Sequence, residues 1–105
     1  NNRLTLARNL LNLGRMHAAR EAPSDALPPL EEALRLYREI RFPRGVAAAL
    51  HTLGEIRALR GDRTAAERDL REAESGFLAL GAAEQVRKVR ESLRTLGGEA
   101  QAGCP

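Results

Sequence analysis

The sequence predicts an all-α fold in which five helices stack as antiparallel hairpins into an α-solenoid. Three observations lead to this prediction. The chain repeats itself at an offset of forty residues, its apolar residues recur three or four positions apart, and we find no convincing segment that alternates apolar and polar residues as a half-buried strand would. Repetition at such a period is typical of stacked helical units, which usually form binding surfaces and not active sites.

The repeat consists of ten identities that fall at helical spacings. The identical pairs are Ala7/Ala47, Leu10/Leu50, Leu13/Leu53, Gly14/Gly54, Ala18/Ala58, Arg20/Arg60, Ala26/Ala66, Leu30/Leu70, Glu32/Glu72 and Ala33/Ala73. One structural unit therefore occurs twice in the chain.

Composition indicates an ordinary soluble domain with a core of Leu, Ala and Val. The chain has 105 residues, of which 43% are hydrophobic, 30% charged and 3% aromatic. The net charge of +3 raises the question of a nucleic-acid partner. Arginines alternate with acids along the helices, however, as in Glu31-Glu32-Ala-Leu-Arg35. This pattern favours solvated faces with ion pairs, and nucleic acid is not the predicted partner.

The only cysteine, Cys104, indicates a reducing compartment, because it cannot form a disulfide within the chain. We interpret it as an inert thiol and predict a cytoplasmic location. No apolar run approaches the length of a membrane span, and no signal peptide is evident, so no membrane association is predicted. Because the chain begins with Asn1, we expect a fragment or a processed product.

The first two helices are predicted over residues 3–20 and 26–41. The first places an apolar stripe inward, formed by Leu6, Leu10, Leu13 and Met16. The second buries Leu30, Ala33, Leu34, Tyr37 and Ile40. Because proline suits only the first turn of a helix, Pro28 and Pro29 predict a start near 27–29 or a distorted opening turn.

The remaining helices are predicted over residues 44–60, 63–80 and 82–97. Their apolar stripes are Val46, Leu50, Leu53 and Ile56; Ala66, Leu70, Ala73, Phe77 and Leu80; and Val86, Val89, Leu93 and Leu96. Gly61 ends the third helix, and Asp62 or Thr64 caps the fourth, where Thr64-Ala-Ala-Glu67 matches a capping box. Gly97-Gly98 is expected to end the last helix and residues 99–105 to form a disordered tail.

The segments Leu10-x-x-Leu13-Gly14 and Leu50-x-x-Leu53-Gly54, followed by Gly61-Asp62, Ala66, Leu70 and Ala73, resemble tetratricopeptide repeats. The usual period of that family is 34 residues. A period of forty is similar to a subclass found in scaffold and motor-adaptor proteins and in large bacterial transcriptional regulators. The Arg- and Ala-rich style is similar to the C-terminal part of actinobacterial regulators.

The resemblance implies a domain over 1–98 with repeat one at about 7–46, repeat two at about 47–86 and a capping helix at about 82–97. Gly14 and Gly54 are expected where the helices of each hairpin cross closely. Tyr37 and Phe77 are expected to fill the wider gap at the far end of each hairpin.

Arg90 and Arg94 replace the Leu and Gly of the repeats, as a solvent-facing cap requires. The first helix shows no such cap, so we expect either further repeats before residue 1 or a dimer through this helix.

The resemblance also implies a concave peptide-binding groove lined by the first helix of each repeat. The corresponding positions are Arg8, Leu11, Asn12 and Arg15; Ala48, His51, Thr52 and Glu55; and Lys88, Glu91, Ser92 and Thr95. An amide such as that of Asn12 can donate to and accept from a peptide backbone. Arg8, Arg15 and Lys88 suit an acidic peptide or a carboxylate.

No cofactor, metal site or enzymatic activity is predicted. His17 and His51 lack further ligands to complete a metal site. The sequence shows no serine–histidine–acid set and no phosphate-binding glycine loop. We predict a protein-protein interaction module that binds a peptide segment and belongs to a larger regulatory protein. The alternatives are self-association through the first helix, and nucleic-acid binding with a steep salt dependence.

Overall fold

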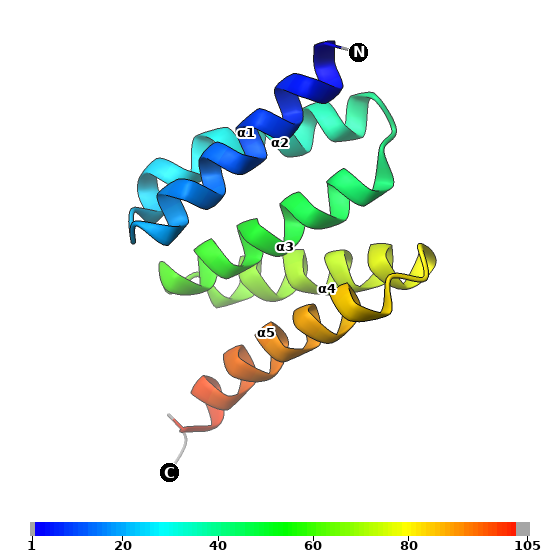
Figure 1. Ribbon diagram of the computed structural model, residues 1–105. Helices are drawn as coiled ribbons and strands as arrows, with labels where there is room; N and C mark the ends of the chain where they lie inside the picture. Colours follow the sequence, from blue (N-terminus) through cyan, green and yellow to red (C-terminus); the bar gives the residue numbers. More distant parts are fainter. Residues whose placement is uncertain (1, 103–105) are drawn as a thin grey trace.

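The computed structural model describes residues 2–102, and within them the chain is helical apart from short turns (Figure 1). The helices are α1 (Asn2–Ala19), α2 (Pro23–Glu39), α3 (Pro43–Leu59), α4 (Arg63–Ala79) and α5 (Ala83–Ala102). The all-α prediction is confirmed, and α1, α3 and α4 lie within one residue of their predicted bounds.

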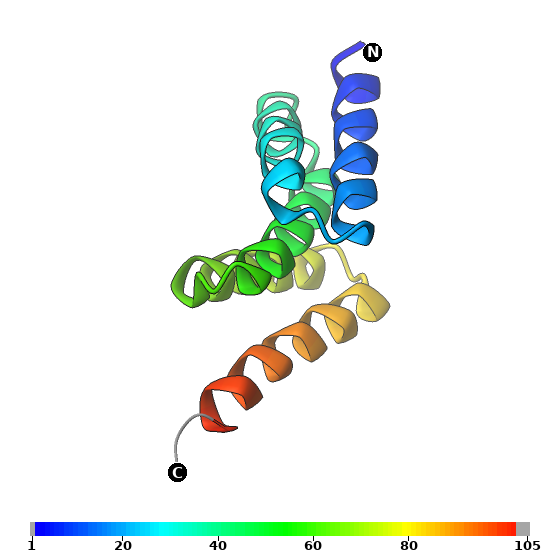
Figure 2. The same ribbon diagram turned by 90° about the vertical axis from the view of Figure 1, so that its left-hand side faces the viewer.

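The helices form two stacked hairpins and a fifth helix. α1 packs on α2, α3 packs on α4, and α2 packs on α3, so the second hairpin lies on the first. α5 packs mainly on α4. α1, α3 and α5 line one side of the stack, with α2 and α4 behind them (Figure 1). The view from the side shows that successive hairpins are rotated relative to each other (Figure 2). The predicted solenoid is confirmed.

Gly14 and Gly54 lie where the two helices of each hairpin cross. A Cβ atom placed on Gly14 would lie 2.4 Å from Cγ of Leu30. One placed on Gly54 would lie 2.7 Å from Cγ of Leu70. A leucine of the second helix therefore rests on bare backbone of the first, as predicted. Ala26, Ala33, Ala66 and Ala73 are fully buried at the other tight points.

The turns between helices recur every twenty residues and share one backbone feature. Each contains a residue with positive φ, namely Glu21 (58°), Arg41 (56°), Gly61 (84°) and Gly81 (69°). Glycine adopts this conformation without a steric cost. For a residue with a Cβ, the same backbone conformation is unfavourable by roughly 1–2 kcal/mol. The turns in the second half of the described chain are therefore less strained than those in the first half.

The cap of α4 is Asp62, whose carboxylate accepts a hydrogen bond from the backbone N–H of Ala65 at 3.3 Å. The predicted capping box at Thr64 and Glu67 was wrong, because α4 begins at Arg63 and Asp62 therefore occupies the N-cap position.

The core consists of two apolar clusters that share α3. Leu53 and Ile56 of α3 join the cluster formed with α1 and α2, which includes Leu11 and Leu30. Ala47 and Leu50 of α3 join the cluster formed with α4 and α5, which includes Leu70, Phe77, Val89 and Leu96. Tyr37 and Phe77 are each 3% exposed. Both core clusters therefore include side chains of α3.

The apolar stripe predicted for α1 was wrong. Leu6 is 49% exposed, Leu13 39% and Met16 44%, while α1 buries Ala7, Leu11 and Gly14. The equivalent face of α3, with Val46, Leu53 and Ile56, packs on the first hairpin. Among the described residues, no helix lies on that side of α1.

The predicted start of α2 was also wrong. The helix begins at Pro23, so Pro28 and Pro29 lie inside it. They remove the N–H groups that would bond to the carbonyls of Ser24 and Asp25. Both of these residues are exposed, so water can satisfy their carbonyl groups. The packing of Ala26 and Leu30, both fully buried, outweighs the unfavourable helix propensity of the prolines.

α5 does not end at Gly97-Gly98, as predicted, but continues to Ala102. A glycine costs an α-helix about 1 kcal/mol relative to alanine, which does not by itself end a helix. Residues 99–102 of the predicted disordered tail are therefore helical, and residues 103–105, including Cys104, lie outside the described residues. Arg90 and Arg94 are exposed, in keeping with a capping helix.

The surface carries interleaved charges, as the sequence indicated. Arg35 bonds to Glu32 and Glu39 on its own helix, Arg38 reaches Glu72 across helices at 2.9 Å, and Arg90 reaches Glu74 at 2.7 Å. None of the helices in the described part of the chain combines the length and the hydropathy that a membrane span needs.

Candidate functional site

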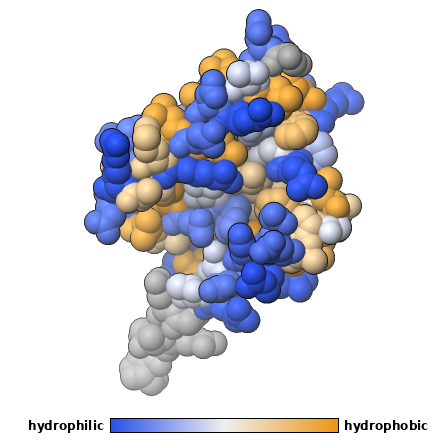
Figure 3. Space-filling model, in the orientation of Figure 1, coloured by the Kyte–Doolittle hydropathy of each residue, from blue (hydrophilic) through white to orange (hydrophobic). Residues whose placement is uncertain are grey.

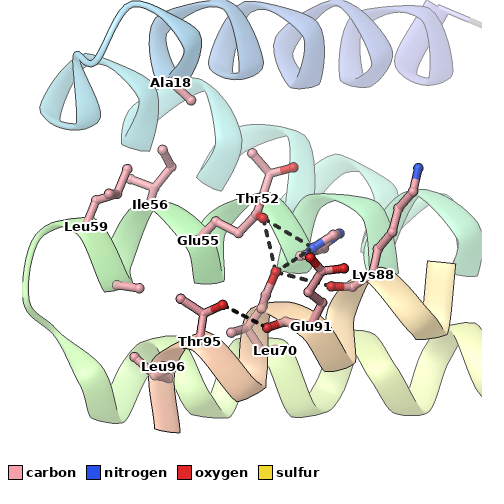
Figure 4. A pocket seen from close by; sticks show the side chains of 13 residues that line it. Ala18, Thr52, Glu55, Ile56, Leu59, Leu70, Lys88, Glu91, Thr95 and Leu96 are labelled. Carbon is pink, nitrogen blue, oxygen red and sulfur yellow. Dashed lines mark hydrogen bonds and ion pairs between the residues drawn. The ribbon is translucent and has the colours of Figure 1, made fainter. Parts of the chain in front are cut away.

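A hollow of about 620 Å³ lies between α3 and α5, on the side of the stack that also carries α1 (Figure 4). It is lined by Ala18, His51, Thr52, Glu55, Ile56, Ala58, Leu59, Leu70, Lys88, Glu91, Ser92, Thr95 and Leu96. The floor is formed where α3 and α5 approach each other, and Ala18 contributes from the C-terminal end of α1.

A second hollow of about 470 Å³ adjoins the first. The two share Ala18, His51, Thr52, Glu55 and Lys88, and the second adds Arg15, Arg44, Ala48, Phe77 and Gln85. We call the residues that line the two hollows the concave groove. The groove follows α3 along its length, with α1 on one side and α5 on the other.

A polar cluster of His51, Glu55 and Ser92 bridges α3 and α5 in the middle of the groove. The Ser92 hydroxyl lies 3.1 Å from Oε2 of Glu55 and 3.4 Å from Nε2 of His51. Nε2 of His51 also lies 3.5 Å from Oε2 of Glu55. The same hydroxyl is within 3.3 Å of the carbonyl oxygen of Lys88. These contacts hold the two helices at a fixed separation across the hollow (Figure 4).

The surroundings of Glu55 favour its ionised form. Hydrogen bonding to His51 lowers the pKa of the Glu55 carboxyl below 4.5, and the hydroxyl of Ser92 and the charge of Arg15 act in the same direction. Partial burial opposes this effect but does not cancel it. The groove therefore holds a fixed negative charge at its centre in neutral solution.

The cluster contains a serine, a histidine and a carboxylate, a combination that the sequence did not reveal. Its geometry is not that of an activated serine nucleophile. In such a triad, the acid holds Nδ1 of the histidine while Nε2 faces the serine. Here both Glu55 and Ser92 contact Nε2 of His51. The serine hydroxyl can also donate directly to Glu55. The arrangement suits a structural bridge with polar groups open to a ligand.

The two ends of the groove differ in chemistry. One end is apolar, with Ile56, Leu96 and Leu59, and the side chain of Leu59 is unusually open at 70% exposure. The other end carries two cations, Arg15 and Arg44. Lys88 lines both hollows. On the face shown in Figure 3, hydrophilic side chains are interleaved with apolar patches.

The structure brings most of the predicted site residues together. Of the twelve predicted positions, nine line the hollows: the first is lined by His51, Thr52, Glu55, Lys88, Glu91, Ser92 and Thr95, and the second also by Arg15 and Ala48. Thr52 is only 8% exposed, and its hydroxyl donates to the carbonyl of Ala48 at 3.2 Å. It therefore shapes the floor and presents little polar surface.

The other three predicted residues lie outside these hollows. Arg8 and Asn12 are exposed on α1 and line neither of them. Leu11 is 5% exposed and belongs to the core between α1, α2 and α3. The sequence placed Leu11 in the groove, but the side chain packs against α2 and α3, so we leave it out of the proposed site.

Sequence reasoning missed the residues at the two ends of the groove. Arg44 and Leu59 lie one helical turn before Ala48 and one turn after Glu55. Extending the predicted face of the third helix by four residues in each direction would have found both. Among the described residues, no group of three or more His, Cys, Asp or Glu side chains is placed to hold a metal ion.

The comparisons with known proteins identify the repeat. The family model for the tetratricopeptide repeat matches residues 6–40, which covers the α1–α2 hairpin. Searches among curated proteins and among solved structures found no match. The α3–α4 hairpin repeats the matched segment at an offset of forty residues, with the same close crossing at its glycine. Residues 6–40 are thus similar to a tetratricopeptide repeat, and repeats of this family generally mediate protein-protein interaction.

Proposed function

We propose that the concave groove binds an extended peptide segment of a partner protein. The observation that carries this proposal is the continuous hollow along α3, framed by three helices and open to solvent. It offers polar groups along its middle and apolar surface at one end, which is the composition of peptide-recognition surfaces. We further propose that the module is not catalytic, because the His51–Ser92 arrangement lacks the geometry of an activated nucleophile.

The chemistry of the groove fits a peptide with an acidic residue. Each peptide unit brings one donor and one acceptor, which the hydroxyls of Ser92 and Thr95 and the ring of His51 can match. Arg15 and Arg44 suit a carboxylate of the partner at the cationic end. Glu55 at the centre of the groove and Glu91 in the hollow with the apolar end disfavour a second acidic residue of the peptide.

The test begins with selection of peptides from a displayed random library against the purified protein. Binding of a selected peptide is then measured by calorimetry to the native chain and to a variant carrying Arg15→Ala. A second variant carries Lys88→Ala. We expect each variant to bind at least tenfold more weakly while its circular dichroism spectrum stays unchanged. Unchanged affinity in both variants would show that the groove is not the binding surface.

Arg63→Ala is the matched control for loss of a cation. Arg63 is exposed at the start of α4, away from the residues that line the groove. The control variant should bind the selected peptide like the native chain. A loss equal to that of Lys88→Ala would indicate that only net charge matters, and would contradict a specific groove.

Self-association through α1 is a second candidate, and the exposed stripe of Leu6, Leu13 and Met16 favours it. Stable interfaces bury about 1,200–2,000 Å² in total, of which three half-exposed side chains supply only a fraction. We therefore expect a dimer only at high concentration. Analytical ultracentrifugation up to high micromolar concentration should show a concentration-dependent dimer that Leu13→Glu abolishes. A strict monomer over that range would rule out this candidate.

We also propose that the module serves a larger regulatory protein of bacterial type, acting in the cytoplasm. The support is the Arg- and Ala-rich style of the repeats and their period of forty. The parent gene tests this proposal. A DNA-binding or nucleotide-switch domain in the same reading frame would support it, and a parent protein without any regulatory domain would contradict it.

A further inference from the structure

The two hairpins differ in side-chain size at one pair of equivalent positions. Residue 36 of α2 is a leucine with 5% exposure, buried in one cluster with Ala7. Forty residues on, its equivalent in α4 is Gly76, and the equivalent of Ala7 is Ala47. A Cβ atom on Gly76 would have only one neighbour within 4 Å, the Cβ of Ala47 at 3.2 Å. The second hairpin therefore lacks the side chain that the first hairpin buries at this place.

A hollow of about 600 Å³ lies beside Gly76. Its walls come from the α2–α3 turn, the first half of α3 and the last part of α4. We call it the edge socket, and its apolar lining is Phe42, Pro43, Val46, Ala47, Leu50, Gly76 and Ala79. Phe42 stacks against the buried ring of Tyr37 with ring centroids 5.7 Å apart, which fixes this wall. The socket shares no lining residue with the concave groove.

The polar rim of the socket is mainly cationic. It consists of Arg38, Arg41 and Glu72, with Ser75 beside them. Arg38 and Glu72 pair with each other at 2.9 Å, so their charges largely cancel. Arg41 is exposed at the left-handed position of the α2–α3 turn, at the mouth of the hollow. A carboxylate beside the socket would meet this guanidinium.

We propose that the edge socket binds a leucine-sized aliphatic side chain of a partner protein, with an adjacent carboxylate of the partner paired to Arg41. The first hairpin gives the model for the occupant, because it buries its own Leu36 at the equivalent place. The rim charge gives the second requirement, because a net cationic rim complements an acidic neighbour. The site is separate from the concave groove, so the two surfaces can engage different segments.

Nuclear magnetic resonance titration tests the proposal with defined peptides. The protein is uniformly labelled with ¹⁵N and titrated with acetyl-Glu-Leu-Glu-amide to 20 mM. We expect saturable shifts of the backbone amides of Gly76 and Ala47, with a dissociation constant in the millimolar range. Acetyl-Glu-Ala-Glu-amide should bind about tenfold more weakly or not at all, because it lacks the apolar area that the socket buries. Equal shifts with both peptides, or no saturation with the leucine peptide, would overturn the proposal.

Two variants separate the apolar requirement from the charge requirement. Gly76→Leu places a leucine in the socket, as the first hairpin does, and should abolish the shifts at Ala47. Arg41→Gln lies on an exposed turn and should leave folding intact. It should remove the preference of the native chain for acetyl-Glu-Leu-Glu-amide over acetyl-Gln-Leu-Gln-amide.

The outcomes of these variants are decisive in either direction. Gly76→Leu protein that folds and binds the leucine peptide like the native chain would overturn the proposal. If that variant does not fold, the test passes to Arg41→Gln, and an unchanged preference for the acidic peptide would overturn the proposal. Shifts confined to α1 or to the concave groove would place the peptide elsewhere and would also count against the socket. Retained binding at the concave groove alone would leave the proposed function intact.

Discussion

Leu13 and Leu53 are the same residue at equivalent positions of the two hairpins, yet their surroundings differ. Leu53 is fully buried, whereas Leu13 is 39% exposed. Leu→Ala at a buried site removes about 2.4 kcal/mol of transfer free energy and adds a cavity term, for a typical total of about 3–4 kcal/mol. Leu13 is only about three fifths buried. Solvent can fill the space that its truncation leaves, so the same change should cost roughly 1.5 kcal/mol.

Urea unfolding at 25 °C, followed by circular dichroism at 222 nm, measures both losses. We expect Leu53→Ala to lower the free energy of unfolding by about 2 kcal/mol more than Leu13→Ala does. The pair of variants controls for chemistry, because the substitution and the position within the repeat are the same. Equal losses would refute the docking of α3 on the first hairpin, or would show that α1 is covered in solution.

Three further outcomes are expected. Arg57→Ala should lower the free energy of unfolding by about 3 kcal/mol, because it leaves Asp69, 4% exposed in its side chain, without its main partner. Pro29→Ala should raise the free energy of unfolding by about 1–3 kcal/mol, because it restores a hydrogen bond inside α2. The Glu55 carboxyl, titrated by carbon-detected magnetic resonance, should have its midpoint below 4.5, and His51→Ala should raise that midpoint.

The two predictions on stability each have a matched control. Arg71→Ala removes an exposed pair with Glu67 and should cost less than about 0.5 kcal/mol, so a loss equal to that of Arg57→Ala would contradict the buried pair. Pro23→Ala lies at the first turn, where proline fits, and should change stability little. If it stabilised the protein as much as Pro29→Ala, the strain would not come from the helix interior.

The pH dependence of Glu55 follows from the direction of its shift. Because the pKa of this carboxyl is lower in the folded protein, its contribution to stability is fully present above the pKa of the unfolded chain. The contribution is lost as the pH falls through the folded pKa. The side chain is 51% exposed, so solvent screening keeps the effect small. A titration midpoint at or above 4.5 would contradict the described contacts.

The sequence predicted well the features whose causes lie within one hairpin. Gly14 and Leu30 are sixteen residues apart in the sequence, and the crossing of two helices joined by a short turn brings them into contact. The forty-residue identities Gly54 and Leu70 repeat this contact. Because the close approach of the two helices involves residues of one hairpin only, the sequence pattern within that hairpin predicts it.

Features that depend on a neighbouring hairpin were not predictable. α1 carries leucines on several faces, and its own sequence does not say which face another helix will cover. Leu13 and Leu53 are identical residues with different burial, because only α3 has a hairpin on that side among the described residues. The start of α2 also depends on a neighbouring helix. The packing of Leu30 outweighs the preference of Pro28 and Pro29 for the first turn of a helix.

The candidate site was partly predictable for a similar reason. The helical register carried His51, Glu55, Lys88 and Glu91 onto one surface, because residues three or four apart share a face. The helical register did not predict how exposed to solvent each side chain is. Leu11, equivalent in position to His51, is buried because it packs in the core cluster with Leu30 of α2 and Leu53 of α3.

We infer that a partner protein binds the face shared by α1, α3 and α5. Magnetic resonance mapping of a library-selected peptide on ¹⁵N-labelled protein tests it most directly. We predict that the largest amide shifts fall on His51, Glu55 and Ser92 and on the residues that flank them. Shifts concentrated on the opposite face, over α2 and α4, with none in the groove, would contradict the claim.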